Sequence, residues 1–314
     1  MVTYTATGHA EPHQANGPTG SLPLQVPLAF IDHHESTGAE GSRGYIGDLS
    51  TYHSDLLTYY SDLMAAAGQS YAPERFAAPR VTHTDLLEAL LARAGSRADH
   101  FDVAVLASAA PDSEPGFPGG YLSQAVPGAG LVFAVSDQGV SAPFTALRLI
   151  ARTMPEGGDG RALLFLLDQS SVLHDGPVRP QLRVEYDAAS VLVLDRSGGL
   201  GRIRLDSAVT IAPENVAEHL ESRLRTVPAS GAPPALLGGY ALDGLLPDAP
   251  GRDIECAAPG RPASGLWRLL GTRLPQWLPT GRQVVLADYD EESARLDTCV
   301  IDIPARSCQG GPSA

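Results

Sequence analysis

Short apolar runs of strand length alternate with stretches of helical spacing along most of the chain, which favours an α/β fold. The apolar runs predict strands at Leu28–Ile31, Asp102–Ala107, Ala162–Leu167, Ser190–Leu194, Gly201–Leu205, Leu236–Leu237, Gln283–Ala287 and Arg295–Ile303. The helical spacing predicts helices at Leu49–Ala67, Thr84–Arg93, Ala146–Met154, Asn215–Arg225 and Gly265–Leu274. The fully apolar run at 162–167 is typical of a strand that is buried on both faces.

Capping and turn residues mark several element boundaries. Thr84 or Asp85 can cap the helix that begins there, and Pro213 opens a later helix. The polar, glycine-bearing stretch Asp32–Gly47 predicts a loop after the first strand. Arg196-Ser-Gly-Gly predicts a turn that joins the strands on either side of it as a pair.

The order of strands and helices begins again near Ser190, which predicts two α/β halves stacked on each other. We place the N-terminal half at 24–189 and the C-terminal half at 190–304. Residues 1–23 are rich in Gly, Pro, Thr and His without periodicity, so we expect a disordered leader there and a disordered tail at 305–314. No internal sequence repeat supports the duplication directly.

The charge balance narrows the choice of partners and of chemistry. The 314 residues carry a formal net charge of −14. Because neutralisation of phosphates by basic residues supplies most nucleic-acid affinity, we expect no nucleic-acid partner and no binding to anionic lipid. All 22 basic residues are arginine, which excludes a Schiff-base lysine, a pyridoxal-phosphate lysine and a phosphate-loop lysine. We expect no cofactor.

Cysteine spacing and hydropathy address the cellular setting. Cys256, Cys299 and Cys308 lie near the end of the chain, with spacings that match neither a zinc site nor a redox pair. No apolar run reaches the roughly 20 residues of a membrane helix, and Met1–Pro23 lacks the layout of a signal peptide. We therefore expect a cytoplasmic protein with no membrane span.

Other polar clusters have a ligand-binding and a structural interpretation, and we favour the structural one for each. Asp32-His-His-Glu35, with His53, offers metal ligands, but adjacent strand residues point to opposite faces, so we expect a polar loop and no metal. The glycines at 157–160 and 198–201 lack the strand–Gly-x-Gly–helix context of a nucleotide site and predict turns. The acidic stretch at 288–292 could hold calcium, but a solvated turn is the simpler expectation.

The segment Phe101–Ser171 resembles the N-terminal half of ketoacyl-synthase III-type condensing enzymes of the thiolase-like superfamily. The matching pieces are Phe101–Ser108, Val135–Leu147 and Arg161–Ser171, and the last third resembles the family's ending at Cys256–Leu270 and Gly281–Asp290. Together these patches cover about two thirds of the chain. The resemblance implies two stacked α/β halves in a layered αβαβα architecture.

The resemblance also implies a nucleophilic cysteine at the start of a buried helix, where backbone N–H groups favour a thiolate and bind an oxyanion. The corresponding turn here is Gln138-Gly-Val-Ser141. Val140 falls at the nucleophile position, or Ser141 if the register shifts by one, while Gln138 and Gly139 form the oxyanion turn. Neither candidate for the nucleophile is a cysteine.

The family completes its site with a histidine and an asparagine or second histidine from the C-terminal half. Here no histidine follows His219, and the loop where the first would fall reads Gly238–Asp243. The only asparagines are Asn16 and Asn215. Because removing members of a catalytic triad typically costs ~10³-fold or more in rate, we do not expect this chain to condense acyl groups by itself.

The leading hypothesis is a non-catalytic subunit that pairs with a catalytic ketoacyl synthase, or with a second copy of itself, in polyketide or fatty-acid-type biosynthesis. The resemblance implies a dimer seam along the strand at 162–167, with Leu163, Phe165 and Leu167 at the seam.

The alternative is an acyltransferase that takes an acyl group from an acyl-carrier-protein or coenzyme A thioester, by direct transfer or through Ser141. His174 and either Asp168 or Asp175 are the nearest candidates to activate that serine, which has a helix-capping role as its structural alternative. A coincidental resemblance would leave an ordinary α/β domain of unknown role.

Overall fold

The protein is described here from a computed structural model covering residues 24–38, 50–66, 68–70, 80–113, 118–126, 128–154, 160–172, 176–195, 198–228, 232–246 and 253–306. The expected leader at 1–23 and most of the expected tail lie outside these residues, as do the side chain of His53 and all of His174 and Asp175.

The N-terminal half builds a five-stranded sheet in the order β3-β2-β4-β5-β1. Its strands are β1 (Gln25–Glu35), β2 (Phe101–Ser108), β3 (Ala129–Val135), β4 (Arg161–Asp168) and β5 (Ala188–Asp195). β2 runs parallel to β3 and β4, whereas β5 is antiparallel to both β4 and β1. The parallel centre of this sheet therefore lies at β2 and β4.

The C-terminal half repeats this strand order and continues the sheet as β6-β11-β10-β8-β9. Its strands are β6 (Gly201–Leu205), β8 (Ala235–Gly238), β9 (Ile254–Cys256), β10 (Arg282–Asp290) and β11 (Arg295–Ile303), with the short β7 (Val209–Thr210) beside β11. β8 is parallel to β9 and β10, and β11 is antiparallel to β10 and β6. Because β1 pairs with β6, the first strands of the two halves join the sheets.

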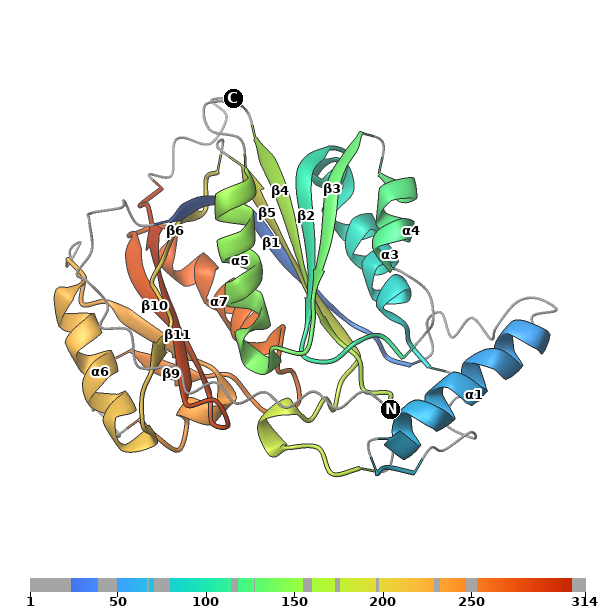
Figure 1. Ribbon diagram of the computed structural model, residues 1–314. Helices are drawn as coiled ribbons and strands as arrows, with labels where there is room; N and C mark the ends of the chain where they lie inside the picture. The colour runs from blue at the N-terminus through green and yellow to red at the C-terminus, as the bar shows by residue number, and fades with distance from the viewer. Residues whose placement is uncertain are drawn as a thin grey trace.

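Helices separate and cover these two sheets in layers, as Figure 1 shows. α5 (Ala142–Thr153) and α7 (Gly265–Trp277) share one core with strands of both halves, so they form an inner layer. α3 (His83–Ala94) and α4 (Pro118–Ala125) cover the outer face of the first sheet. α6 (Pro213–Thr226) covers the outer face of the second. The expected αβαβα architecture is therefore confirmed.

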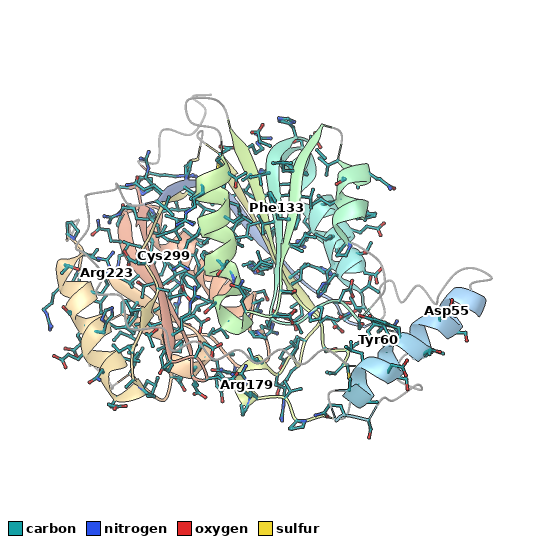
Figure 2. The ribbon with its side chains drawn as sticks, viewed as in Figure 1. Asp55, Tyr60, Phe133, Arg179, Arg223 and Cys299 are labelled. Atoms are coloured by element: carbon teal, nitrogen blue, oxygen red, sulfur yellow. The ribbon has the colours of Figure 1, made fainter. Side chains whose placement is uncertain are left out.

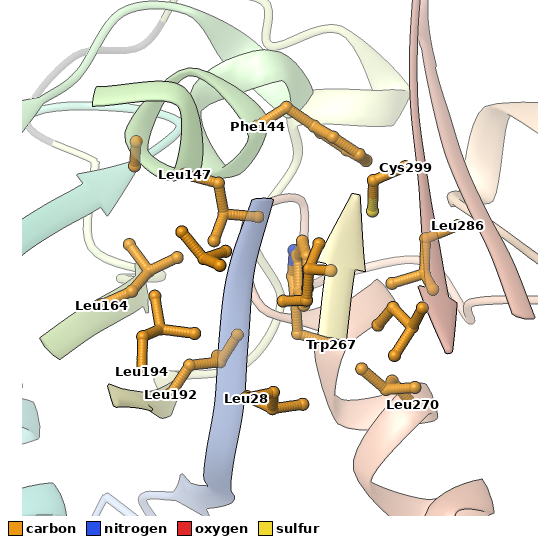
Figure 3. Close-up of a cluster of buried hydrophobic side chains, with 14 of the residues drawn as sticks. Leu28, Phe144, Leu147, Leu164, Leu192, Leu194, Trp267, Leu270, Leu286 and Cys299 are labelled. Atoms are coloured by element: carbon orange, nitrogen blue, oxygen red, sulfur yellow. The ribbon is translucent and has the colours of Figure 1, made fainter. Parts of the chain in front are cut away.

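The inner layer is held by large apolar side chains. Phe144 and Leu147 of α5 meet Trp267 and Leu270 of α7 within the cluster drawn in Figure 3, and all four are fully buried. The ring centroids of Phe144 and Trp267 lie 5.9 Å apart in a tilted arrangement. Such aromatic pairs contribute about 0.5–1.5 kcal/mol beyond the burial of their surface.

α3 begins one residue before the predicted helix, and a different residue caps it. Thr82 is the N-cap: its hydroxyl accepts from the Asp85 backbone N–H at 3.1 Å, and the Asp85 carboxylate accepts from the Thr82 N–H at 2.9 Å. The expectation that Thr84 or Asp85 is the capping residue is therefore wrong, although Asp85 supplies the reciprocal half of this capping box.

Three expectations about the strands and about the boundary between the halves also need correction. Asp32–Glu35 belong to β1 and not to a loop, because each pairs with a residue of β5. The strands on either side of the turn at 196–199 are not paired with each other, because β1 lies between β5 and β6. The expected boundary at residue 190 falls inside β5, which completes the first sheet, so the halves divide after Asp195.

The expected dimer seam at Leu163, Phe165 and Leu167 is wrong. β4 pairs with β2 on one side and β5 on the other, so it offers no free edge to another chain. The three side chains are fully buried under α3 and α4 in the outer core of the first sheet. Burial of each such side chain stabilises a folded protein by about 1.5–3 kcal/mol. These three side chains therefore stabilise the fold of this chain and are not available to an interface.

Within the described part of the chain, no helix has the length and apolar character needed to cross a membrane.

Candidate functional site

The turn at 136–141 connects β3 to the inner helix α5. Asp137 and Gly139 both have positive φ angles, of 60° and 52°. A β-carbon on Gly139 would lie 2.9 Å from Oδ2 of Asp290 and 3.2 Å from a methyl group of Leu182. Both the backbone conformation and the close neighbours therefore demand glycine at this position.

The structure brings the four predicted site residues together in this turn. Val140 and Ser141 are buried, with 5% and 4% of their surfaces exposed, whereas Gln138 is exposed. Ser141 occupies the N-cap position of α5, but its hydroxyl makes no capping hydrogen bond; its backbone N–H donates to the Gln138 carbonyl at 3.0 Å. The expected capping role of the Ser141 side chain is therefore absent.

A very small cavity lies against Val140, where the resemblance places the nucleophile. Its volume is about 10 Å³, close to the minimum for one water molecule. Gly239 and Tyr240 contribute to its wall, as does Asp288. Gly239 and Tyr240 belong to the loop where the family's first histidine is expected. Of the residues that the structure describes, no histidine, cysteine or asparagine lines this cavity.

Asp288 is a buried acid at this wall. Its carboxylate accepts a hydrogen bond from the adjacent Tyr289 backbone N–H at 2.9 Å and packs against Gly239. Burial raises the pKa of Asp288 well above its usual range, and the nearby Asp297 and Asp290 carboxylates raise it further. The expected solvated turn at 288–292 is wrong for Asp288, because this side chain lies inside the protein.

Asp290 also faces the turn and is held in place by its own loop. Its Oδ1 accepts from the backbone N–H groups of Glu292 and Ser293 at 3.0 and 3.1 Å. Arg179, labelled in Figure 2, forms an ion pair with Glu292 at 2.5 Å and lies 3.8 Å from Asp290. The start of α5 therefore faces two carboxyl groups, Asp288 and Asp290.

Asp168 plays a related role at the start of the other inner helix. Its carboxylate accepts from the backbone N–H groups of Ala263 and Ser264 at 2.9 and 2.8 Å and from the Ser264 hydroxyl at 2.6 Å. Burial raises the pKa of Asp168 to about 6, and these hydrogen bonds oppose that rise. Asp168 thus fixes the loop before α7, and all of its short contacts are structural.

Arg261 is a further residue at this site that was not predicted from the sequence. It lines the small cavity, forms an ion pair with Glu35 at 2.6 Å, and stacks on the ring of Tyr186 with 3.8 Å to the centroid. The signal available in the sequence was its place within the matching patch Cys256–Leu270. Its guanidinium is already paired, so it does not replace a catalytic asparagine or histidine.

The acidic side chains of the possible metal cluster at Asp32–Glu35 on β1 interact with arginines instead. Asp32 forms a bidentate hydrogen-bonded pair with Arg93, at 3.0 Å for both contacts, and Glu35 is held by Arg261. Among the described residues, no group of three His, Cys, Asp or Glu side chains could hold a metal ion.

The comparisons with known proteins identify the fold. No family model matches the sequence, and no curated protein sequence matches it. The solved 3-oxoacyl-(acyl-carrier protein) synthase from Burkholderia xenovorans LB400 matches with a TM-score of 0.58 and 14% identity, over 90% of this chain and 96% of its own. AbyA1, a tetronic acid condensing enzyme, matches with a TM-score of 0.54 and 17% identity, over 72% and 87% of the two chains.

An acyltransferase, ChlB3, matches with a TM-score of 0.51 and 13% identity, over 90% of this chain and 99% of its own. At these identities the likeness concerns the fold. The chain has a thiolase-like fold of the ketoacyl-synthase III type.

Proposed function

We propose that this chain is a non-catalytic ketosynthase-like subunit that pairs with a catalytic ketoacyl synthase in polyketide or fatty-acid-type biosynthesis. The observation that carries the proposal is the closed site: the fold is complete, but the space beside Val140 measures about 10 Å³. A thioester cannot enter a cavity of that size.

The electrostatics of the turn support the same proposal. Acyl transfer through a tetrahedral intermediate requires hydrogen-bond donors directed at a developing negative charge. Here the carboxyl groups of Asp288 and Asp290 lie against the loop and turn where such donors would act. Placing an oxyanion beside the Asp290 carboxylate would add like-charge repulsion, so this site does not favour the intermediate.

The edge of the first sheet is the surface that we propose for pairing, in place of β4. Among the described residues β3 pairs only with β2, so its other edge is free. Leu131 on this strand is 58% exposed, and Phe133, labelled in Figure 2, is half-buried. A free, apolar edge strand is suited to pairing with a strand of another chain through main-chain hydrogen bonds.

The test is co-expression of the full chain with a cysteine-bearing ketoacyl synthase homologue, followed by size-exclusion chromatography and a condensation assay. We expect the two chains to co-elute and the products of condensation to change in amount or length. Leu131→Arg should abolish co-elution, because it places a charge on the apolar edge. Leu63→Arg, at an exposed apolar position on α1 (Ser50–Ala66), is the matched control and should leave co-elution unchanged.

Two results of this experiment would contradict the proposal. A chain that stays monomeric, or pairs only with itself, and that leaves condensation unchanged would exclude the proposed role. Self-pairing that also disappears in Leu131→Arg would assign the β3 edge to a homodimer instead.

The second candidate function is acyl transfer from an acyl-carrier-protein or coenzyme A thioester, with Ser141 as nucleophile. It is favoured by the position of Ser141 at the start of α5, where backbone N–H groups converge. The likeness to ChlB3, an acyltransferase, points the same way. An added acyl mass after incubation with acyl thioesters, lost in Ser141→Ala, would support this function, and an unchanged mass would count against it.

A further inference from the structure

An open cleft lies on the outer face of the second sheet, beside the junction between the two halves. Its volume is about 460 Å³, within the range of about 300–1,000 Å³ that ligand pockets occupy. α6 covers this sheet face elsewhere (Figure 1), but the helix ends at Thr226, and Pro228 just beyond it lines the cleft. The cleft therefore lies where the helical layer stops. Its lining residues are Gln25, Arg202, Arg204, Pro228, Gln283, Asp302, Ile303 and Pro304.

Four neighbouring strands place the polar side chains of the cleft on one face of the sheet. Alternate residues of β6 belong to the inner core, so Arg202 and Arg204 point to the outer face. Across the strands, Arg202 lies opposite Asp302 of β11, which lies opposite Gln283 of β10. On the other side, Gln25 of β1 lies opposite Arg204. The floor of the cleft is therefore a continuous antiparallel part of the sheet.

The charges in the cleft are not balanced. Asp302 pairs with Arg204 at 3.0 Å and accepts from the side-chain amide of Gln283 at 2.8 Å. The exposed guanidinium of Arg202 donates from Nη1 to Oε1 of Gln25 at 3.2 Å and forms no ion pair with any residue that the structure describes. Two arginines and one aspartate thus leave one positive charge uncompensated, in a chain whose net charge is −14.

A ligand with a single negative charge suits this arrangement. A guanidinium binds a carboxylate through two parallel N–H···O hydrogen bonds, and the Nε–Nη2 edge of Arg202 is free for such a pair among the described residues. Asp302 and the carbonyl end of α6 are both negative and would oppose a second charge on the ligand. Pro228, Ile303 and Pro304 supply apolar walls for a compact neutral body.

From this geometry we infer that the cleft binds a small carboxylate with a compact apolar body. The carboxylate pairs with the Nε–Nη2 edge of Arg202, and the body lies against Pro228 and Pro304. No residue of the turn at 136–141 and no residue of β3 lines the cleft. The site is formed by this chain alone, so it does not depend on the proposed pairing with a ketoacyl synthase.

The test uses the isolated full chain and probes that share a benzene ring: benzoate, benzamide and benzylamine. Titrations followed by saturation-transfer difference NMR should show that benzoate binds more tightly than the neutral benzamide, with the cationic benzylamine weakest. Pro304→Trp places a large side chain in the cleft and should abolish binding of benzoate. Pro304→Ala is the matched control, because it shortens the same exposed wall and should keep the binding.

A second pair of variants tests the charge. Arg202→Gln should weaken benzoate binding about two- to fivefold, as expected for a solvent-exposed ion pair, and should leave benzamide unchanged. Arg152→Gln removes another exposed arginine, on α5 and outside the cleft, and should have no effect. Because both arginines are exposed, both variants should fold, which circular dichroism checks.

Two results would overturn the site itself: absence of benzoate binding to the unchanged protein, or benzoate binding that survives Pro304→Trp. Equal affinity for benzoate and benzamide would overturn the preference for an anion. An equal loss of benzoate affinity in Arg202→Gln and Arg152→Gln would overturn the assignment of Arg202, because the effect would then come from the charge of the whole protein and not from this cleft.

Discussion

At the scale of single residues, acidic side chains connect the two halves of the protein. Asp168, at the end of β4, binds the backbone before α7, and Asp290, at the end of β10, packs against the turn before α5. The fourth strand of each half therefore ends in a carboxylate at the start of the inner helix of the other half. In the turn before α5, this arrangement places the Asp290 carboxylate against Gly139.

Gly139 is the residue that makes the closed turn possible, and its substitution tests that geometry. Gly139→Ala should destabilise the protein by about 1–3 kcal/mol, because alanine must adopt a positive φ and its β-carbon meets Asp290 and Leu182. Urea denaturation would measure the change. Gly244→Ala is the matched control, since Gly244 has no neighbour within 4 Å of an added β-carbon. Equal effects of the two substitutions would contradict the argument.

At the scale of elements, the sequence predicted those strands and helices whose local pattern matches their burial. Arg295–Ile303 was predicted with the bounds that β11 has, and the helix at Gly265–Leu274 needed extension only at its end. β3 was missed even though its residues are apolar, because an exposed edge strand has no clear alternation to distinguish it. The incorrect pairing of β5 with β6 has a different cause: β1 separates them, and that long-range contact leaves no signal in the turn itself.

The capping box of α3 offers a test at this scale. Thr82→Ala removes the hydroxyl that accepts from the Asp85 N–H and should destabilise the protein by about 1 kcal/mol. Thermal or urea unfolding would detect the change. Thr84→Ala, two residues further into the helix, should have a smaller effect because Thr84 is not the N-cap. A larger effect at Thr84 would restore the capping role that the sequence suggested.

In the candidate site, too, the local sequence predicts one part, whereas contacts between distant residues determine the rest. The turn 138–141 was located from its sequence, and the structure places it at the start of the inner helix α5. The neighbours that close the turn come from residues near 182, 239, 261 and 288, which are distant in sequence. The sequence shows that Val140 and Ser141 stand in this turn, but only the folded chain shows that carboxyl groups and a leucine side chain lie beside it.

At the scale of the whole molecule, the repeated strand order makes the two halves structurally equivalent without visible sequence repetition. In each half the first strand lies at the junction between the halves, and one helix belongs to the shared inner layer. The apolar side chains of α5 and α7 therefore belong to one core and not to two. Since each half would expose its inner helix if separated, we expect the halves to depend on each other for stability.

A substitution in this shared layer tests that dependence. Leu270→Ala, on α7 in the C-terminal half, should cost about 2–5 kcal/mol because it leaves a cavity in the common core. Near-ultraviolet and far-ultraviolet circular dichroism, recorded through urea unfolding, should give one coincident transition for both the original protein and the variant. If the halves were independent, the variant would instead show an early transition of the C-terminal half followed by an unshifted transition of the N-terminal half, because a defect on α7 would not reach the first sheet.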